Sequence, residues 1–179
     1  MISSEAAKNA NTNGGQPDGL SIRRVLMPVD FSVCTLETLQ YAKLMAEKFD
    51  AMVDLLHVIQ SNFTRQEEPR LPAGMIPALG RTARQELTKL VGLVQEGKGG
   101  TVFSIRVREG LVHEVILNEA LATNARLIVM GTRDRSWLSG PFRRHTVKHV
   151  IQNSPCPVVV IRTGVTGLGA SQMRAASLQ

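Results

Sequence analysis

The stretch "RVLMPVDFSVCTLETLQYAKLMAEKF", Arg24 to Phe49, decides the fold class of this chain. Its first part, Arg24 to Val29, is a short apolar run rich in strand-forming residues. In its second part the apolar residues recur at helical spacing, at Leu36, Leu39, Ala42, Met45, Ala46 and Phe49. A strand followed directly by an amphipathic helix is the repeating unit of α/β proteins.

The alternation of strand and helix continues along the chain. Further apolar strands are predicted at 51–59, 101–107, 126–131 and 156–162. Apolar residues at helical spacing mark the helices between them: Leu79, Ala83, Leu87, Leu90, Val91 and Val94; Val112, Val115, Ile116 and Ala120; Val147, Val150 and Ile151. The order βαβαβαβαβ predicts an open five-stranded parallel sheet with helices on both faces.

Two segments differ from the rest of this pattern. Residues 101–107 alternate between apolar and polar side chains, which is typical of an edge strand. The connection between Gln60 and Pro77 contains several prolines, so we expect a loop there and no further element.

The length and composition suit one domain. A chain of 179 residues with 43% apolar residues can bury one sizeable core. Residues 1–20 and 164–179 contain few large apolar side chains, so burial cannot offset the entropy of ordering them. We expect two flexible tails around a domain that spans residues 21–163.

Composition also limits the compartment and the partners. The N-terminus lacks the apolar segment of a secretory signal and no apolar run reaches the length of a membrane span, so we expect a cytoplasmic protein. Cys34 and Cys156 form neither a CxxC pair nor a zinc motif. The net charge of +6 leaves nucleic acid open as a partner, but aromatic residues are only 4% and no nucleic-acid-binding signature occurs.

The sequence carries no recognisable catalytic motif. "GKGG", Gly97 to Gly100, lacks the spacing of a P-loop, and "HEVIL" at His113 lacks the second histidine of a zinc protease. His145 and His149 stand four residues apart, but no further ligand joins them, so no metal site is predicted. His57 lies inside an apolar strand, where a core role is favoured over a ligand role. We expect a protein that is not an enzyme, with slow ATP hydrolysis as the remaining catalytic alternative.

A ligand site is predicted where the first and fourth strands end. In an open parallel sheet, ligands bind at the carboxyl ends of neighbouring strands whose following helices leave to opposite faces. If the first strand is central and the fourth lies beside it, that position falls between Asp30 and Gly131. Asp30 can accept hydrogen bonds from a base or ribose or can cap the next helix, and Ser32 is also placed to cap it. The helix that begins near Arg143 presents free N–H groups to an anion.

Five stretches of the chain together resemble the universal stress proteins. They are "VLMPVDFS" (Val25 to Ser32), "LLHVI" (Leu55 to Ile59), the single Gly110, "LIVMGT" (Leu127 to Thr132) and "SPCPVVVIR" (Ser154 to Arg162). The resemblance covers essentially the whole core and leaves out the tails.

That resemblance implies an architecture, an assembly and a role. The implied sheet is Rossmann-like, with strand order 3-2-1-4-5. The implied assembly is a homodimer through the last strands, Val158 to Arg162, which would cover an apolar edge that is otherwise prone to aggregate. The implied role is in stress adaptation, through switching that depends on a ligand or a protein partner.

Family members that bind ATP resemble the pattern Gly, two residues, Gly, nine residues, Gly, then Ser or Thr. In this chain these positions hold Gly131, Asp134, Arg144 and His145, with Thr146 next. The nucleotide-binding residues that the resemblance implies are Pro28, Val29, Asp30, Val58, Met130, Gly131, Arg133, Asp134, Arg144, His145 and Thr146.

The departures from this pattern weaken the predicted nucleotide site. Asp134 places a carboxylate beside the expected phosphates, and Arg144 fills space that backbone N–H groups should line. We therefore expect a dimeric regulatory or binding module with a degraded nucleotide-binding loop. Two alternatives stay open: a sensor that binds ATP, with Mg²⁺, through arginine side chains such as Arg133, and a basic protein that binds nucleic acid.

Overall fold

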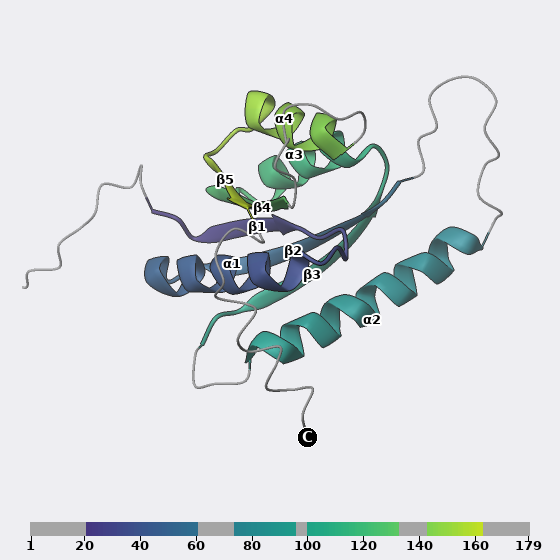
Figure 1. Cartoon of the computed structure of the whole chain (residues 1–179), viewed down its shortest axis with the longest axis horizontal. Helices are drawn as coiled ribbons and strands as arrows, with labels where there is room; N and C mark the ends of the chain where they lie inside the picture. The colour runs from purple at the N-terminus through teal and green to yellow at the C-terminus, as the bar shows by residue number, and fades with distance from the viewer. Residues whose placement is uncertain (1–20, 61–73, 96–99, 133–142, 163–179) are drawn as a thin grey trace, which may run out of the picture.

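The computed structural model describes residues 21–60, 74–95, 100–132 and 143–162. Strands and helices alternate in the predicted order (Figure 1). In chain order they are β1 (Arg24–Pro28), α1 (Thr35–Phe49), β2 (Met52–Ile59), α2 (Met75–Gln95), β3 (Phe103–Glu109), α3 (Val112–Ala122), β4 (Leu127–Thr132), α4 (Arg143–Asn153) and β5 (Val158–Arg162). The predicted tails lie outside the described residues.

The five strands form one parallel sheet in the order β3-β2-β1-β4-β5. This confirms the predicted open, Rossmann-like α/β sheet and the edge position of the third strand. Helices α1 and α2 cover one face, and α3 and α4 cover the other (Figure 1). The helices change face between β1 and β4 because the chain builds outward from β1 in two opposite directions with crossovers of one hand.

Each face of the sheet carries its own hydrophobic cluster. One cluster packs β1, β2 and β4 against α1 and α2, and the other packs the same three strands against α3 and α4. The central strand serves both because successive side chains of a strand point to opposite faces. Val25 and Met27 belong to the first cluster and Leu26 to the second, and all three are at most 1% exposed.

The described structure corrects several local predictions. Helix α2 begins at Met75, so the prediction of a loop as far as Pro77 is wrong for its last three residues. A proline fits there because the first N–H groups of a helix have no partner within the helix. Phe49, Leu79 and Ile151 were predicted core residues, but they are 47%, 40% and 42% exposed.

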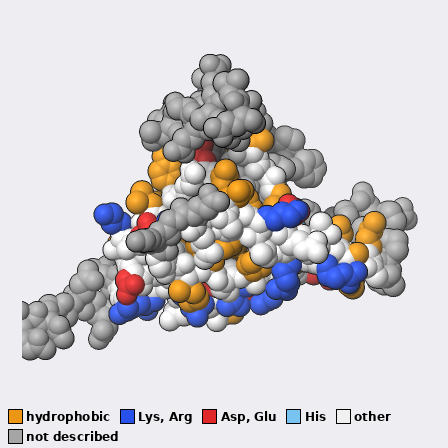
Figure 2. All heavy atoms as spheres, turned by 90° about the horizontal axis from the view of Figure 1, so that it is seen from below, with side chains coloured by type: hydrophobic (Ala, Val, Ile, Leu, Met, Phe, Trp, Pro, Cys, Tyr) orange, Lys and Arg blue, Asp and Glu red, His pale blue; other side chains and the backbone are white. Residues whose placement is uncertain are grey.

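The exposure of Leu79 follows from the position of α2. The amino-terminal half of α2 extends beyond the sheet, which leaves Leu79 with less of the molecule to pack against (Figure 1). On the face seen from below, hydrophobic side chains alternate with basic ones, and acidic side chains lie among them (Figure 2). Two lysines of the helices α1 and α2 are paired with acidic neighbours on the same helix, Lys43 with Glu47 and Lys89 with Glu86.

A chain of ion pairs spans strands β1, β2 and β3 on the face of the sheet that α3 covers. The carboxylate of Asp54 on β2 is fully buried, and it accepts hydrogen bonds from Arg24 on β1 at 3.1 Å and from Arg106 on β3 at 3.2 Å. Arg106 also donates to Glu119 on α3 at 3.1 Å, and Arg108 donates to the same carboxylate at 2.9 Å. The network therefore ties three strands to α3 where apolar side chains are few.

We predict that Asp54→Ala lowers the free energy of unfolding by about 3 kcal/mol, because it leaves two guanidinium groups without their buried partner. Urea denaturation followed by circular dichroism measures this change. Glu86→Ala, which breaks an exposed pair on α2, is the matched control and should change stability by less than about 0.5 kcal/mol. Equal effects of the two variants would show that the network adds nothing beyond surface charge pairing.

Candidate functional site

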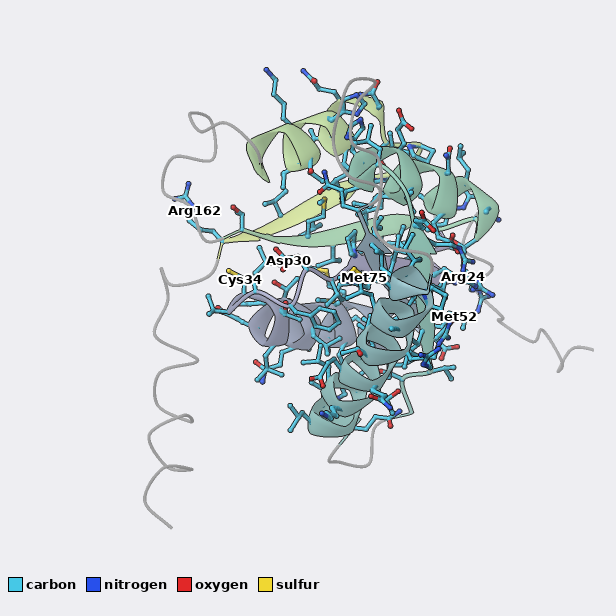
Figure 3. All side chains as sticks on the ribbon, turned by 90° about the vertical axis from the view of Figure 1, so that its right-hand side faces the viewer. Arg24, Asp30, Cys34, Met52, Met75 and Arg162 are labelled. Atoms are coloured by element: carbon cyan, nitrogen blue, oxygen red, sulfur yellow. The ribbon has the colours of Figure 1, made fainter. Side chains whose placement is uncertain are left out.

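The carboxyl ends of β1 and β4 form the topological switch point of the sheet. The two strands are neighbours, and the helices that follow them, α1 and α4, pack on opposite faces. Asp30 and Cys34 lie at the same end of the sheet as Arg162 at the end of β5, whereas Arg24 and Met52 lie at the opposite end (Figure 3). This is the place at which open α/β sheets bind ligands.

The β1–β4 ladder stops well before these carboxyl ends. It pairs Val25 with Leu127 and Leu26 with Ile128. The ladders on either side, by contrast, run on to Pro28 in β1 and to Thr132 in β4. The polar groups that follow β1 and β4 are therefore not consumed by pairing between these two strands.

The implied apolar site residues divide between the two faces of the sheet. Val58 and Met130 belong to the cluster under α3 and α4, and Pro28 shares that face because it follows Leu26 by two residues. Val29 instead belongs to the α1 and α2 cluster and is 5% exposed. The side chains of Val29 and Met130 are thus core residues, and a ligand on the α4 face would meet Pro28 and Val58.

Asp30 belongs to a tight turn between β1 and α1. Its Oδ1 accepts a hydrogen bond from the N–H of Ser32 at 3.0 Å, and its side chain is exposed. The next residue, Phe31, has φ of 53°, a left-handed conformation that costs a bulky residue of order 1 kcal/mol or more. The helix begins only at Thr35 and its N-cap is Cys34, which makes no side-chain cap bond, so neither Ser32 nor Asp30 occupies the N-cap position.

His57 holds this turn from the neighbouring strand. Its Nδ1 lies 2.8 Å from the carbonyl oxygen of Val29, and a carbonyl only accepts, so Nδ1 carries the proton and donates. The ring of His57 also contacts the ring of Phe31, with centroids 4.7 Å apart. His57 therefore positions the turn that carries Asp30.

Gly131 is required by packing, whatever it binds. A Cβ at this position would collide with Oγ1 of Thr38 and would lie 3.4 Å from the Cβ of Cys34, both near the start of α1. Thr38 cannot easily move away, because its hydroxyl donates to the carbonyl of Cys34 at 2.8 Å. The glycine thus lets α1 approach the end of β4.

The phosphate half of the implied site is described only in part. Arg133 and Asp134 lie outside the described residues. Helix α4 begins at Arg143, as predicted, so Arg144 and His145 fall in its first turn, and their side chains also lie outside the described residues. Thr146 completes that turn and is partly buried.

Three further features of the described residues concern the cysteines, metal binding and membrane insertion. Both cysteines are thiols outside any disulfide; Cys34 is buried, and burial raises the pKa of the Cys156 thiol above its ordinary value. The described side chains include no group of three or more histidine, cysteine or acidic residues that could hold a metal ion. Among the described helices, none combines the length and the apolar composition needed to cross a bilayer.

Comparison with known proteins assigns the chain to a family. A family model, that of the universal stress protein family, matches residues 21–162. The chain belongs to the universal stress protein family. It is 30% identical over 145 residues to universal stress protein MJ0531 of Methanocaldococcus jannaschii, an alignment that covers 78% of this chain and 82% of that protein.

Solved structures of universal stress proteins share the fold. One, in complex with cAMP, matches with a TM-score of 0.54 and 19% identity over 80% of this chain and 99% of the other. Another, from Archaeoglobus fulgidus and in complex with dAMP, matches with a TM-score of 0.55 and 16% identity over 80% of this chain and 100% of the other. At these identities the likeness establishes a common architecture.

We predict that Gly131→Ala lowers the free energy of unfolding by about 1 to 3 kcal/mol, because the added methyl group overpacks the contact with Thr38. Thr38→Ala should relieve the clash, so a double-mutant cycle in urea should show coupling between the two positions. Gly92→Ala is the control: a Cβ there meets nothing within 4 Å, and alanine favours the helix. Additive effects of Gly131→Ala and Thr38→Ala would contradict the packing role.

We predict that His57→Leu is less stable than His57→Asn by about 1 to 3 kcal/mol. The asparagine amide can still donate to the Val29 carbonyl, whereas leucine leaves this acceptor without its donor. Chemical denaturation of the two variants gives the difference. If the leucine variant matches the asparagine variant, the hydrogen bond does not hold the turn.

Proposed function

We propose that this universal stress protein is a cytoplasmic, dimeric regulatory module that binds an adenine nucleotide at the switch point without turning it over. The observation that carries the proposal is the placement of Asp30 and Gly131 after neighbouring strands whose helices leave to opposite faces. The complexes of two related proteins with cAMP and dAMP add support, because both ligands are adenine nucleotides with a single phosphate.

The half of the site that would hold the nucleoside is well formed. Asp30 offers an exposed carboxylate on a turn fixed by its bond to Ser32 and by the contacts of His57. A carboxylate on a rigid turn suits the hydroxyl groups of a ribose. Pro28 and Val58 add apolar surface on the α4 face, against which an adenine ring could pack.

The half of the site that would hold phosphates favours a ligand with a small negative charge. The glycine pattern of ATP-binding relatives is interrupted here by Asp134 and Arg144. A triphosphate beside the carboxylate of Asp134 is repelled more than a monophosphate, since the repulsion grows with the ligand's charge. The N–H groups in the first turn of α4 and nearby arginines would suffice for one phosphate. We therefore propose a nucleotide with one phosphate as the ligand, in preference to ATP with Mg²⁺.

The proposed dimer forms through the free edge of the sheet. Strand β5 pairs with β4 along one side and ends the sheet on the other. Its residues Val158 to Ile161 are all apolar and only partly buried. Unpaired apolar edges are normally covered, and a second copy of the chain supplies matching N–H and C=O groups.

We predict that nucleotide-stripped protein binds cAMP or AMP more tightly than ATP with Mg²⁺ in isothermal titration. Asp30→Ala should weaken binding of the monophosphates by about 1.5 to 3 kcal/mol, the value of a hydrogen bond to a charged group. Glu86→Ala on α2 is the control and should leave the affinity unchanged. Absence of heat with every nucleotide would instead favour a module that binds a protein partner.

The same titration tests the cause of the preference. The double variant Asp134→Gly/Arg144→Gly should increase the affinity for ATP more than that for cAMP, because it restores space and removes the carboxylate. Tighter binding of ATP by the unchanged protein would contradict the proposal and favour an arginine-based triphosphate site.

A further inference from the structure

Two histidines from distant parts of the chain meet between α3 and α4. The rings of His113, on α3, and His149, on α4, have centroids 4.0 Å apart and planes inclined by 42°. Both side chains are partly buried. The pair lies at the seam between the two helices that cover this face, whose apolar contact is made by the fully buried Ile116 and Val150.

The surroundings of His113 favour a neutral imidazole. His113 is the second residue of α3, where the positive end of the helix dipole opposes a further positive charge. The amide Nδ2 of Asn153 donates to the carbonyl of His149 at 2.8 Å and lies 3.3 Å from Nδ1 of the same residue. The amide of Asn153 therefore contacts His149 from the next turn of the same helix.

We propose that the His113–His149 contact is an acid-sensitive latch, which holds α4 against α3 at neutral pH and releases it when both imidazoles are protonated. Two positively charged rings with centroids 4.0 Å apart repel each other, whereas two neutral rings attract. This inference does not depend on the nature of any bound ligand, because the contact lies between elements of the chain itself.

Opening of the latch would affect the proposed ligand site at the switch point, because α4 takes part in both. His149 follows Thr146 by three residues, so the two side chains lie on the same side of the helix. The first turn of α4 lies just beyond β4, at the edge where the ligand site is proposed. Acidification would therefore loosen the helix whose amino end completes that site.

The charges near the pair define the direction of the pH response. The pKa of His113 lies below its ordinary value of 6.5 because of burial and then of the charge on His149, while Glu114 raises it. Lys148 precedes His149 on α4. On the side of β2 and β3, the described carboxylates Asp54 and Glu119 are bound by arginines.

The sign of the linkage follows from that depressed pKa. A histidine that is harder to protonate in the folded state binds more protons when unfolded. Its contribution to stability is full above pH 6.5 and is lost as the pH falls below 6.5 toward the folded pKa. The latch should therefore open in mildly acidic solution and hold at neutral pH.

Hydrogen exchange of the full chain tests the latch directly. Exchange rates of α4 amides, corrected for the intrinsic effect of pH, should rise at least about fivefold between neutral pH and about pH 5.5, while those of α1 should not. His149→Gln should abolish this rise. His113→Phe should do the same while keeping a ring against His149, which separates charge from packing.

Proton NMR of the histidine rings supplies a second readout. The apparent pKa of His113 should lie below 6.5 in the unchanged protein, should rise in His149→Gln and should fall further in Glu114→Gln, because the carboxylate favours the protonated ring. The proposal is overturned if α4 protection is independent of pH, or if His113→Phe and His149→Gln lose protection in acid as fully as the unchanged protein does.

Discussion

The central position of β1 is the constraint on which the rest of the molecule depends. A strand flanked on both sides by parallel partners and covered on both faces must be apolar in its middle, as Val25, Leu26 and Met27 are. Because β1 starts both halves of the sheet, α1 and α4 must leave on opposite faces. The ligand position, the turn of Asp30 and the close approach of α1 to Gly131 all follow from that divergence.

The sequence was sufficient for the fold because its signals are periodic and redundant. Apolar strands alternate with amphipathic helices, so the parallel sheet and the edge position of its third strand follow from local patterns, whereas the full strand order came from the family resemblance. The errors at Phe49, Leu79 and Ile151 have one cause: helical spacing shows which face is apolar but not where the covering layer ends. The loop prediction failed at Met75 because proline is tolerated in the first turn of a helix.

The candidate site was predicted less completely, because its parts come from separate elements. The positions of Asp30 and Gly131 follow from topology, but the clamp of His57 on Val29 depends on a contact between neighbouring strands. The sequence does carry a signal for the buried network around Asp54, since an acidic residue inside an apolar strand requires partners. It carries no signal for the contact of His113 with His149, because two helices far apart in sequence bring these residues together. The predicted nucleotide-binding residues therefore remain a proposal.

The packing of Gly131 against Thr38 bears on how members of this family are classified from sequence alone. A glycine that an adjacent helix demands will persist in chains that have given up the ligand, because its replacement destabilises the domain itself. Its presence therefore carries little information about nucleotide binding. The later positions of the pattern, held here by Asp134 and Arg144, must therefore be considered together with Gly131 to separate sensors from repurposed scaffolds.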